Sequence, residues 1–117
     1  MLTVGVDTYP QGSGFDPLPF PVASANRLSE FFRAQVGSGT PYQDIKVWDP
    51  LLDSAATTEA IQSALSEIAT DTRSDDVALI YLAGHGQVDF GDEMFYFASA
   101  NSSSVRLSST GGSIVQI

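Results

Sequence analysis

The sequence predicts an α/β protein with a mainly parallel sheet, because strand-like and helix-like segments alternate along it. Three short apolar runs have the length and composition of strands, and the segments between them carry apolar side chains at helical spacing. This alternation is typical of a parallel sheet with helices on its faces. At 117 residues, the chain forms one domain or part of one.

The first half of the chain predicts a strand, a long loop and a helix. Residues 2–6 form a short apolar run, and residues 10–21, rich in proline and glycine, form an extended loop. A loop of this length is either functional or mobile. A helix is expected at 23–35, and its apolar face comprises Leu28, Phe31 and Phe32.

The second half predicts another strand, another helix and a third strand. Residues 44–48 alternate as a strand. Thr57 or Thr58 can cap the second helix, whose buried stripe is Ile61, Ala64, Leu65 and Ile68. The continuous apolar run that starts at Val77 and ends before Gly84 predicts a fully buried central strand.

The last third of the chain has a different character. Residues 88–97 predict a small hairpin with its turn near Gly91-Asp92, and the Ser-rich residues 99–113 predict a loop. An apolar pattern restarts at 114–117. Three parallel strands would leave one sheet edge open beside the strand that starts at Val77, so further strands are expected from a C-terminal segment or a second chain.

Charge and composition exclude several classes of protein. Five Lys and Arg stand against fourteen Asp and Glu, a formal net charge of −9, which argues against binding to nucleic acid or to an anionic membrane. The same balance fits an acidic soluble protein or, alternatively, a pocket for basic substrates. The absence of cysteine excludes disulfides and thiolate metal sites. No apolar stretch is long enough to span a membrane and the start lacks signal-peptide features, so we expect a cytoplasmic protein.

His85 is the strongest candidate for chemistry. It is the only histidine, it follows an apolar strand, and it stands between Gly84 and Gly86. Ligands of open α/β sheets bind at the carboxyl ends of the strands, where an imidazole can act as a general base. The N–H of Gly86 can serve an oxyanion hole. The alternatives are a strand-end histidine without a role and a glycine required only by the turn.

Asp7 is the candidate for substrate binding. It lies just beyond the first strand, at the sheet edge where His85 is expected, and it can hold a cationic substrate group. The alternative is a strand-end aspartate that caps a turn. Asp16 in the adjoining loop is a weaker candidate for the same role.

Other chemistries are disfavoured by their motifs. A Ser–His hydrolase lacks its Gly-x-Ser-x-Gly elbow, and no phosphate-binding loop or other cofactor motif is present. Asp89, Asp92 and Glu93 lack the spacing of a calcium loop and predict a solvated hairpin tip rather than a metal site. The serines that such a hydrolase could use as nucleophiles are Ser99, Ser102, Ser103, Ser104, Ser108, Ser109 and Ser113.

Residues 81–87, Tyr-Leu-Ala-Gly-His-Gly-Gln, resemble the His-bearing segment of the caspase-like cysteine peptidases, the clan of caspases, metacaspases and paracaspases, in its bacterial form. Three further segments are similar to that family in the same order. Residues 4–9 resemble its first strand and exit, residues 23–28 the start of its first helix, and residues 56–61 the start of its second. The resemblance extends to about Phe97.

This resemblance implies a three-layer caspase-like fold, with residues 1–117 as its N-terminal, large-subunit-like part, and hydrolysis of protein or peptide substrates without a cofactor. His85 would be the catalytic histidine and Gly86 an oxyanion-hole donor. The nucleophile would be a cysteine at the end of the next strand. Asp7 and the acidic balance fit the preference of metacaspases and paracaspases for Arg or Lys at the cleavage site.

The chain departs from the family pattern because it contains no cysteine. In caspases the histidine precedes the cysteine by about 50 residues, and this chain continues for only 32 residues (117 − 85 = 32). We expect the N-terminal piece of a processed protease, or a fragment, with the cysteine on a C-terminal segment or a second chain. The alternatives are a Cys-less pseudoenzyme and a non-catalytic binding or scaffold module. A receiver-like or flavodoxin-like domain fits less well, because its acidic cluster or phosphate loop is missing.

Overall fold

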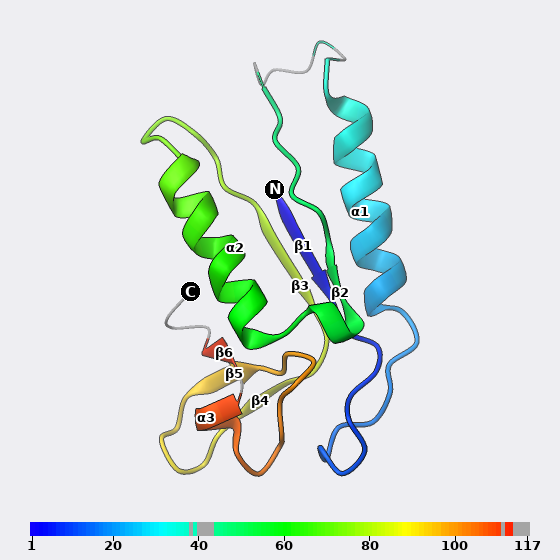
Figure 1. Ribbon diagram of the computed structural model, residues 1–117, viewed down its shortest axis with the longest axis vertical. Helices are drawn as coiled ribbons and strands as arrows, with labels where there is room; N and C mark the ends of the chain where they lie inside the picture. Colours follow the sequence, from blue (N-terminus) through cyan, green and yellow to red (C-terminus); the bar gives the residue numbers. More distant parts are fainter. Residues whose placement is uncertain (38, 40–43, 111, 114–117) are drawn as a thin grey trace.

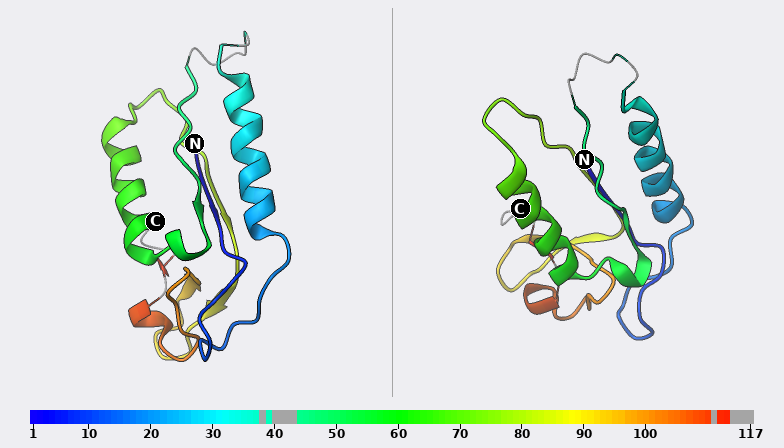
Figure 2. Two further views of the ribbon diagram at one scale, coloured as in Figure 1. Left: turned by 45° about the vertical axis from the view of Figure 1, so that its right-hand side comes forward. Right: turned by 45° about the horizontal axis from the view of Figure 1, so that its top comes forward.

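A parallel sheet lies between two helices, as the sequence predicts (Figures 1 and 2). The computed structural model describes residues 1–37, 39, 44–110 and 112–113. The sheet has the strand order β2-β1-β3, and both pairings are parallel. The α/β class is therefore confirmed. The elements of this layer are β1 (Leu2–Gly5), α1 (Pro21–Gln35), β2 (Leu51–Leu52), α2 (Thr58–Asp71) and β3 (Ile80–Ala83).

The central strand β1 is buried on both faces and divides the interior into two parts. Alternate residues of a strand point to opposite faces. Leu2 and Val4 belong to the main hydrophobic core, together with Ile61 and Ile68 of α2. Gly5 faces the other side, where α1 packs closely against it. The two helices therefore cover opposite faces of the sheet.

Helix α1 begins two residues earlier than predicted, and its predicted apolar face is confirmed in part, since Leu28 and Phe32 are half-buried. Pro21 occupies its first turn, where a missing N–H costs nothing. Its buried residues are Ala25 and Ser29, whereas Phe31, predicted to lie on the core face, is 58% exposed. The reason is the close approach to β1, which admits only small side chains along the contact line.

The second strand is displaced from its predicted position. Residues 44–48 are extended but are not a strand, and β2 forms at Leu51–Leu52. The extended segment still bonds to the start of β1, because Trp48 donates its N–H to the carbonyl of Met1 at 2.9 Å. Pro50 has no N–H to contribute to a ladder, so regular pairing resumes only after it.

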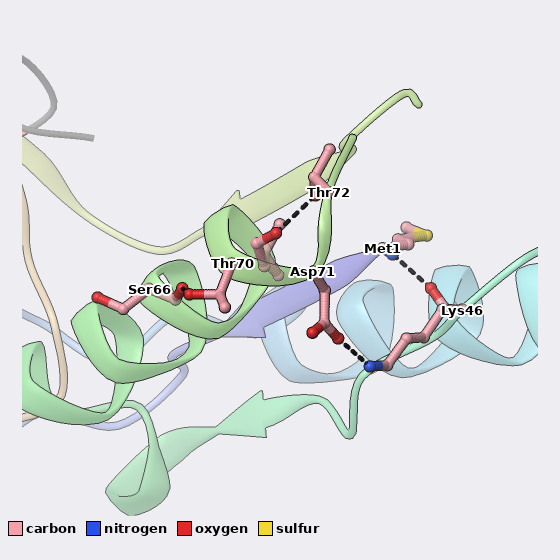
Figure 3. Close-up of polar contacts among 7 residues, drawn as sticks. Met1, Lys46, Ser66, Thr70, Asp71 and Thr72 are labelled. Atoms are coloured by element: carbon pink, nitrogen blue, oxygen red, sulfur yellow. Dashed lines mark hydrogen bonds and ion pairs between the residues drawn. The ribbon is translucent and has the colours of Figure 1, made fainter. Parts of the chain in front are cut away.

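Helix α2 agrees with its prediction. Its cap is Thr57, whose side chain accepts a hydrogen bond from Ala60 N–H at 3.2 Å, and Ile61 and Ile68 are buried. Near its other end, Thr70 donates to the carbonyl of Ser66, and Asp71 pairs with Lys46 beside the start of β1 (Figure 3). These contacts fasten the end of the sheet opposite to His85. None of the helices in the described part of the chain has the length and apolar character needed to cross a membrane.

Strand β3 is not the fully buried central strand that its apolar run predicts. It is the edge strand of the described sheet, it covers only Ile80–Ala83, and its residues are half-buried. The preceding Val77 is 75% exposed. A continuous apolar run is typical of a strand that has a neighbouring strand on each side. Within the described residues, β3 has one neighbouring strand, β1. Among the residues that the structure describes, the edge beside this strand has no neighbouring strand, as predicted.

The hairpin after β3 is confirmed, and the Ser-rich segment is more ordered than predicted. Strands β4 (Gly86–Val88) and β5 (Phe95–Phe97) pair antiparallel. Within the predicted loop 99–113, a short helix α3 (Leu107–Thr110) forms, and β6 (Gly112–Ser113) pairs with β5. A loop prediction from serine content fails here because Leu107 is fully buried and anchors the segment.

The hairpin carries a tyrosine whose titration should affect stability at alkaline pH. The hydroxyl of Tyr96 donates to Oδ2 of Asp92 at 2.6 Å, and this bond, with burial, raises the pKa of Tyr96 to about 12. Tyrosine in an unfolded chain titrates near pH 10, at about its reference pKa. Between about pH 10 and 12 the unfolded state loses a proton that the folded state keeps, so the free energy of unfolding falls as pH rises.

We expect Tyr96→Phe to remove part of this alkaline loss of stability. Urea unfolding of both proteins between pH 8 and 12, values chosen to bracket the two pKa values, measures it. The free energies of unfolding should converge as pH rises through this window. Curves that stay parallel would show that the Tyr96–Asp92 bond has no part in it.

Candidate functional site

His85 lies at the carboxyl end of the parallel sheet, in the turn that joins β3 to β4 (Figure 1). The register of β3 against β1 fixes the position of His85 along the sheet. Gly5 pairs with Ala83, and Val6 N–H donates to the carbonyl of Ala83 at 2.9 Å. The loop that leaves β1 is at the same end of the sheet. The sequence-predicted position of His85 is therefore observed.

The His85 imidazole is held by a main-chain carbonyl. Its Nε2 lies 2.8 Å from the carbonyl oxygen of Asp16. Because a carbonyl can only accept a hydrogen bond, Nε2 carries the proton of the neutral ring and Nδ1 holds the lone pair. The side chain of Asp16 is exposed, so the structure brings this residue to His85 through its backbone and not through the carboxylate considered above.

Two aromatic rings enclose the imidazole. The ring of Phe15 stacks on it with the centroids 5.3 Å apart, and the ring of Tyr9 is tilted against it at the same distance. Tyr9 and Phe15 also contact each other at 5.2 Å. The three rings form one mutually contacting cluster, in which Phe15 stacks on the imidazole and Tyr9 lies beside both rings.

The long proline-rich loop provides this enclosure. It is fastened by bonds from Leu18 N–H to the carbonyl of Asp7 and from Ser104 N–H to the carbonyl of Ser13, each 2.8 Å long. These contacts and those with His85 fix the position of the loop, and a functional role for it stays a prediction.

The N–H of Gly86 is not used by the ladder of β4 and β5, and its role as an oxyanion-hole donor stays a prediction. Ala98 N–H bonds to the carbonyl of His85 and Asp89 N–H to that of Met94, each at 2.9 Å. With the alternation of an antiparallel ladder, these bonds make Gly86 and Phe97 a non-hydrogen-bonded pair. The N–H of Gly86 therefore points away from β5. A side chain at Gly86 would collide with the Phe95 ring, whose Cζ would lie 2.4 Å from its Cβ.

Asp7 is at the predicted edge and has structural contacts there. Its Oδ1 accepts the N–H of Val22 in the first turn of α1 at 2.8 Å, where a negative charge is favoured. Its own N–H donates to Oδ1 of Asp53 at 2.8 Å. These contacts fit the alternative of an aspartate that caps a turn, and its binding of a substrate stays a prediction.

The serines that lie deepest are used in packing. Ser99 and Ser102 are buried and their hydroxyls lie 2.9 Å apart. Ser99 Oγ also lies 2.6 Å from Thr58 Oγ1 at the start of α2, and Ala100 N–H bonds to the carbonyl of Ala56 at 2.8 Å. This network fastens the segment after β5 to α2.

Two acidic residues of the hairpin, Asp89 and Asp92, accept hydrogen bonds from backbone N–H groups. Asp89 accepts the N–H groups of Gly91 and Ser108, which lower the pKa of Asp89. Asp92 accepts the N–H of Met94 at 2.9 Å. Among the residues that the structure describes, no group of three or more His, Cys, Asp and Glu side chains is arranged to hold a metal ion.

Sequence reasoning missed three residues that build the site. Tyr9 and Phe15 enclose His85, and Asp53, with a φ of 45°, accepts the N–H groups of Asp7 and Thr8. Two aromatic residues in a loop that leaves a strand at the His85 edge were a usable signal for the first two. Nothing local marks Asp53, whose partners lie more than forty positions away.

No family model, no curated protein and no solved structure matches the chain.

Proposed function

We propose that this chain is the His-bearing part of a caspase-like cysteine endopeptidase. The observation that carries the proposal is the bond between His85 Nε2 and the carbonyl of Asp16. In the neutral imidazole this bond makes Nδ1 the nitrogen with the lone pair, at the sheet edge where ligands of α/β proteins bind. A cysteine from another segment or a second chain supplies the nucleophile, because this chain contains none.

The reaction follows from these two groups. His85 Nδ1 takes the proton of the cysteine thiol, and the thiolate attacks the peptide carbonyl. The oxyanion that forms receives the N–H of Gly86, which is not used by the β4–β5 ladder. The imidazolium returns its proton to the leaving amine, and water then hydrolyses the thioester with His85 again as the base.

The open edge of β3 is the proposed docking site of the cysteine-bearing segment. The strand is apolar but only half-buried, and Leu79 and Val77 before it are exposed. A shallow groove of about 460 Å³ lies beside the strand and is lined by Ser24, Arg27, Leu28, Phe31 and Tyr81. A strand added to this edge would pair with β3 and bring its carboxyl end next to His85. The exposed Phe31 and the half-buried apolar strand then both gain a partner.

The proposed cleavage-site preference is for Arg or Lys. The formal charge of −9 favours the approach of basic peptides. The half-buried Asp7 lies just after β1, at the sheet edge that carries His85, and is the carboxylate proposed to receive the basic side chain. Cleavage only after acidic residues would contradict this part of the proposal and leave the proteolytic part standing.

The proposal is tested by intact-mass measurement and a peptide-cleavage assay on the protein purified in its native form. Denaturing intact-mass measurement should find a cysteine-containing polypeptide in equal amount with this chain, or covalently continuous with it. The same preparation should cleave fluorogenic peptides with Arg or Lys before the scissile bond, and iodoacetamide should abolish the cleavage, since the thiolate is the nucleophile.

A preparation that contains no cysteine and cleaves none of the peptides would contradict the proposal. The chain would then act as a binding module or pseudoenzyme built on the same α/β scaffold. Cleavage that survives iodoacetamide would contradict the cysteine mechanism in particular.

A further inference from the structure

The hydroxyl of Tyr9 lies between two strands at the point where they would bond to each other. The ladder of β4 and β5 places His85 opposite Ala98, and one of the two expected bonds, Ala98 N–H to His85 carbonyl, is present at 2.9 Å. The reciprocal bond is replaced. His85 N–H donates to the Tyr9 hydroxyl at 2.9 Å, and this hydroxyl donates to the carbonyl of Ala98 at 3.0 Å.

The residues around the Tyr9 hydroxyl bury it and leave room for it. Tyr9 is buried, with 8% of its surface exposed. A side chain at Gly84 would have its Cβ 2.8 Å from the hydroxyl, so the glycine before His85 makes the room that the bridge needs. Burial raises the pKa of Tyr9, which keeps on the hydroxyl the proton that it donates to Ala98.

The same residue also contacts the imidazole. The Tyr9 ring lies against the His85 ring and against Phe15, whose neighbour Asp16 binds Nε2. Tyr9 therefore touches the main chain of His85 through its hydroxyl and the side chain through its ring. Tyr9 follows β1 in the chain and bonds to residues at the start and end of the antiparallel hairpin, so it connects the parallel sheet to that hairpin.

We propose that Tyr9 is the positioning residue of His85: its hydroxyl fixes the His85 backbone against the hairpin, and its ring holds the imidazole on the Asp16 carbonyl. The catalytic consequence of this role rests on the proposed function, whereas the positioning itself does not. The hydroxyl is the part that can be removed while the ring stays.

The test is Tyr9→Phe, observed by nuclear magnetic resonance of His85. The chain has one histidine, so the ring nitrogen signals need no assignment. In the native protein the ¹⁵N shifts should report a ring protonated at Nε2. In Tyr9→Phe the His85 amide loses its acceptor, and we expect its hydrogen exchange to accelerate about tenfold, as for a lost buried hydrogen bond. The ring nitrogen shifts should move toward a mixture of tautomers.

The matched control is Tyr81→Phe. It removes the same hydroxyl from a tyrosine of β3 that lines the groove beside α1. This control should leave the His85 amide and ring signals in place. Unchanged His85 signals in folded Tyr9→Phe, or equal changes in Tyr81→Phe, would overturn the proposal.

A second variant keeps the test decisive if Tyr9→Phe does not fold. Gly84→Ala places a methyl group against the Tyr9 hydroxyl and should change the His85 signals in the same direction. Where both variants fold, the effect of Gly84→Ala should be smaller in the Tyr9→Phe background, because the hydroxyl it displaces is gone. A Gly84→Ala protein with native His85 signals would overturn the proposal.

These measurements contain no substrate and no cysteine, so they separate the two claims. If the His85 signals change in Tyr9→Phe but the native protein never cleaves peptides, the positioning role of Tyr9 is supported and the proposed protease function is contradicted. If the native protein cleaves peptides, Tyr9→Phe should lower kcat about tenfold or more while KM changes little, because a misplaced base affects the chemical step.

Discussion

Replacing His85 by alanine should abolish peptide cleavage by the native protein and leave its fold intact. A general base contributes about 10² to 10⁴ in rate, and this chain has no second histidine to replace it. The structural cost is limited, because the imidazole makes one exposed hydrogen bond, to the Asp16 carbonyl, and contacts the rings of Tyr9 and Phe15. We expect a loss of about 1–3 kcal/mol in the free energy of unfolding and the backbone bond to Tyr9 to remain.

Two measurements on the same samples check this expectation. Cleavage of an Arg-containing peptide should fall at least about 10²-fold, while urea unfolding should remain cooperative. The control is Phe90→Ala, which removes another ring, 89% exposed at the hairpin tip, and should not reduce cleavage. An unfolded His85→Ala protein would identify a structural histidine, and a folded one with normal cleavage would remove His85 from the mechanism.

An element could be predicted from the sequence where the residues of that segment alone determine its secondary structure and its buried face. Helix α2 shows this, since its cap and apolar stripe are all local. Strand β2 shows the opposite case, because Pro50 moved the regular pairing beyond the alternating segment. On α1 the prediction was wrong for Phe31, because the close approach of the helix to the distant Gly5 determines which side chains fit beneath it, and periodicity contains no such information.

The candidate site divides in the same way. His85 and Gly86 could be located from their strand and their neighbours, since the end of a parallel strand has a known place in the sheet. For Tyr9 and Phe15 the sequence holds a usable signal, their place in the loop that leaves β1, although they reach His85 across about seventy positions. For the Asp16 carbonyl it holds none. A carbonyl, moreover, belongs to every residue, so no residue type indicates which one will orient the imidazole.

The close contact between β1 and α1 leads to the largest expected effect on stability. At Gly5 an added Cβ would lie 2.5 Å from the carbonyl oxygen of Pro21 and 2.8 Å from its carbon. Both atoms belong to the backbone of the first turn of α1, which Asp7 also holds through Val22. The helix therefore cannot yield by a change of rotamer.

Gly5→Ala should lower the free energy of unfolding by about 3 kcal/mol or more, the upper range for overpacking a core, and Tm by roughly 10–15 °C. Thermal and urea unfolding measure both. Gly91→Ala is the matched control, since its Cβ would meet only the flexible Oδ1 of Asp89, at 3.2 Å, and should change stability by less than about 0.5 kcal/mol. Ala25→Gly removes the third close neighbour, at 3.0 Å, but leaves Pro21 in place. It should not rescue Gly5→Ala, and a rescue would show that side chains rather than the helix backbone limit this contact.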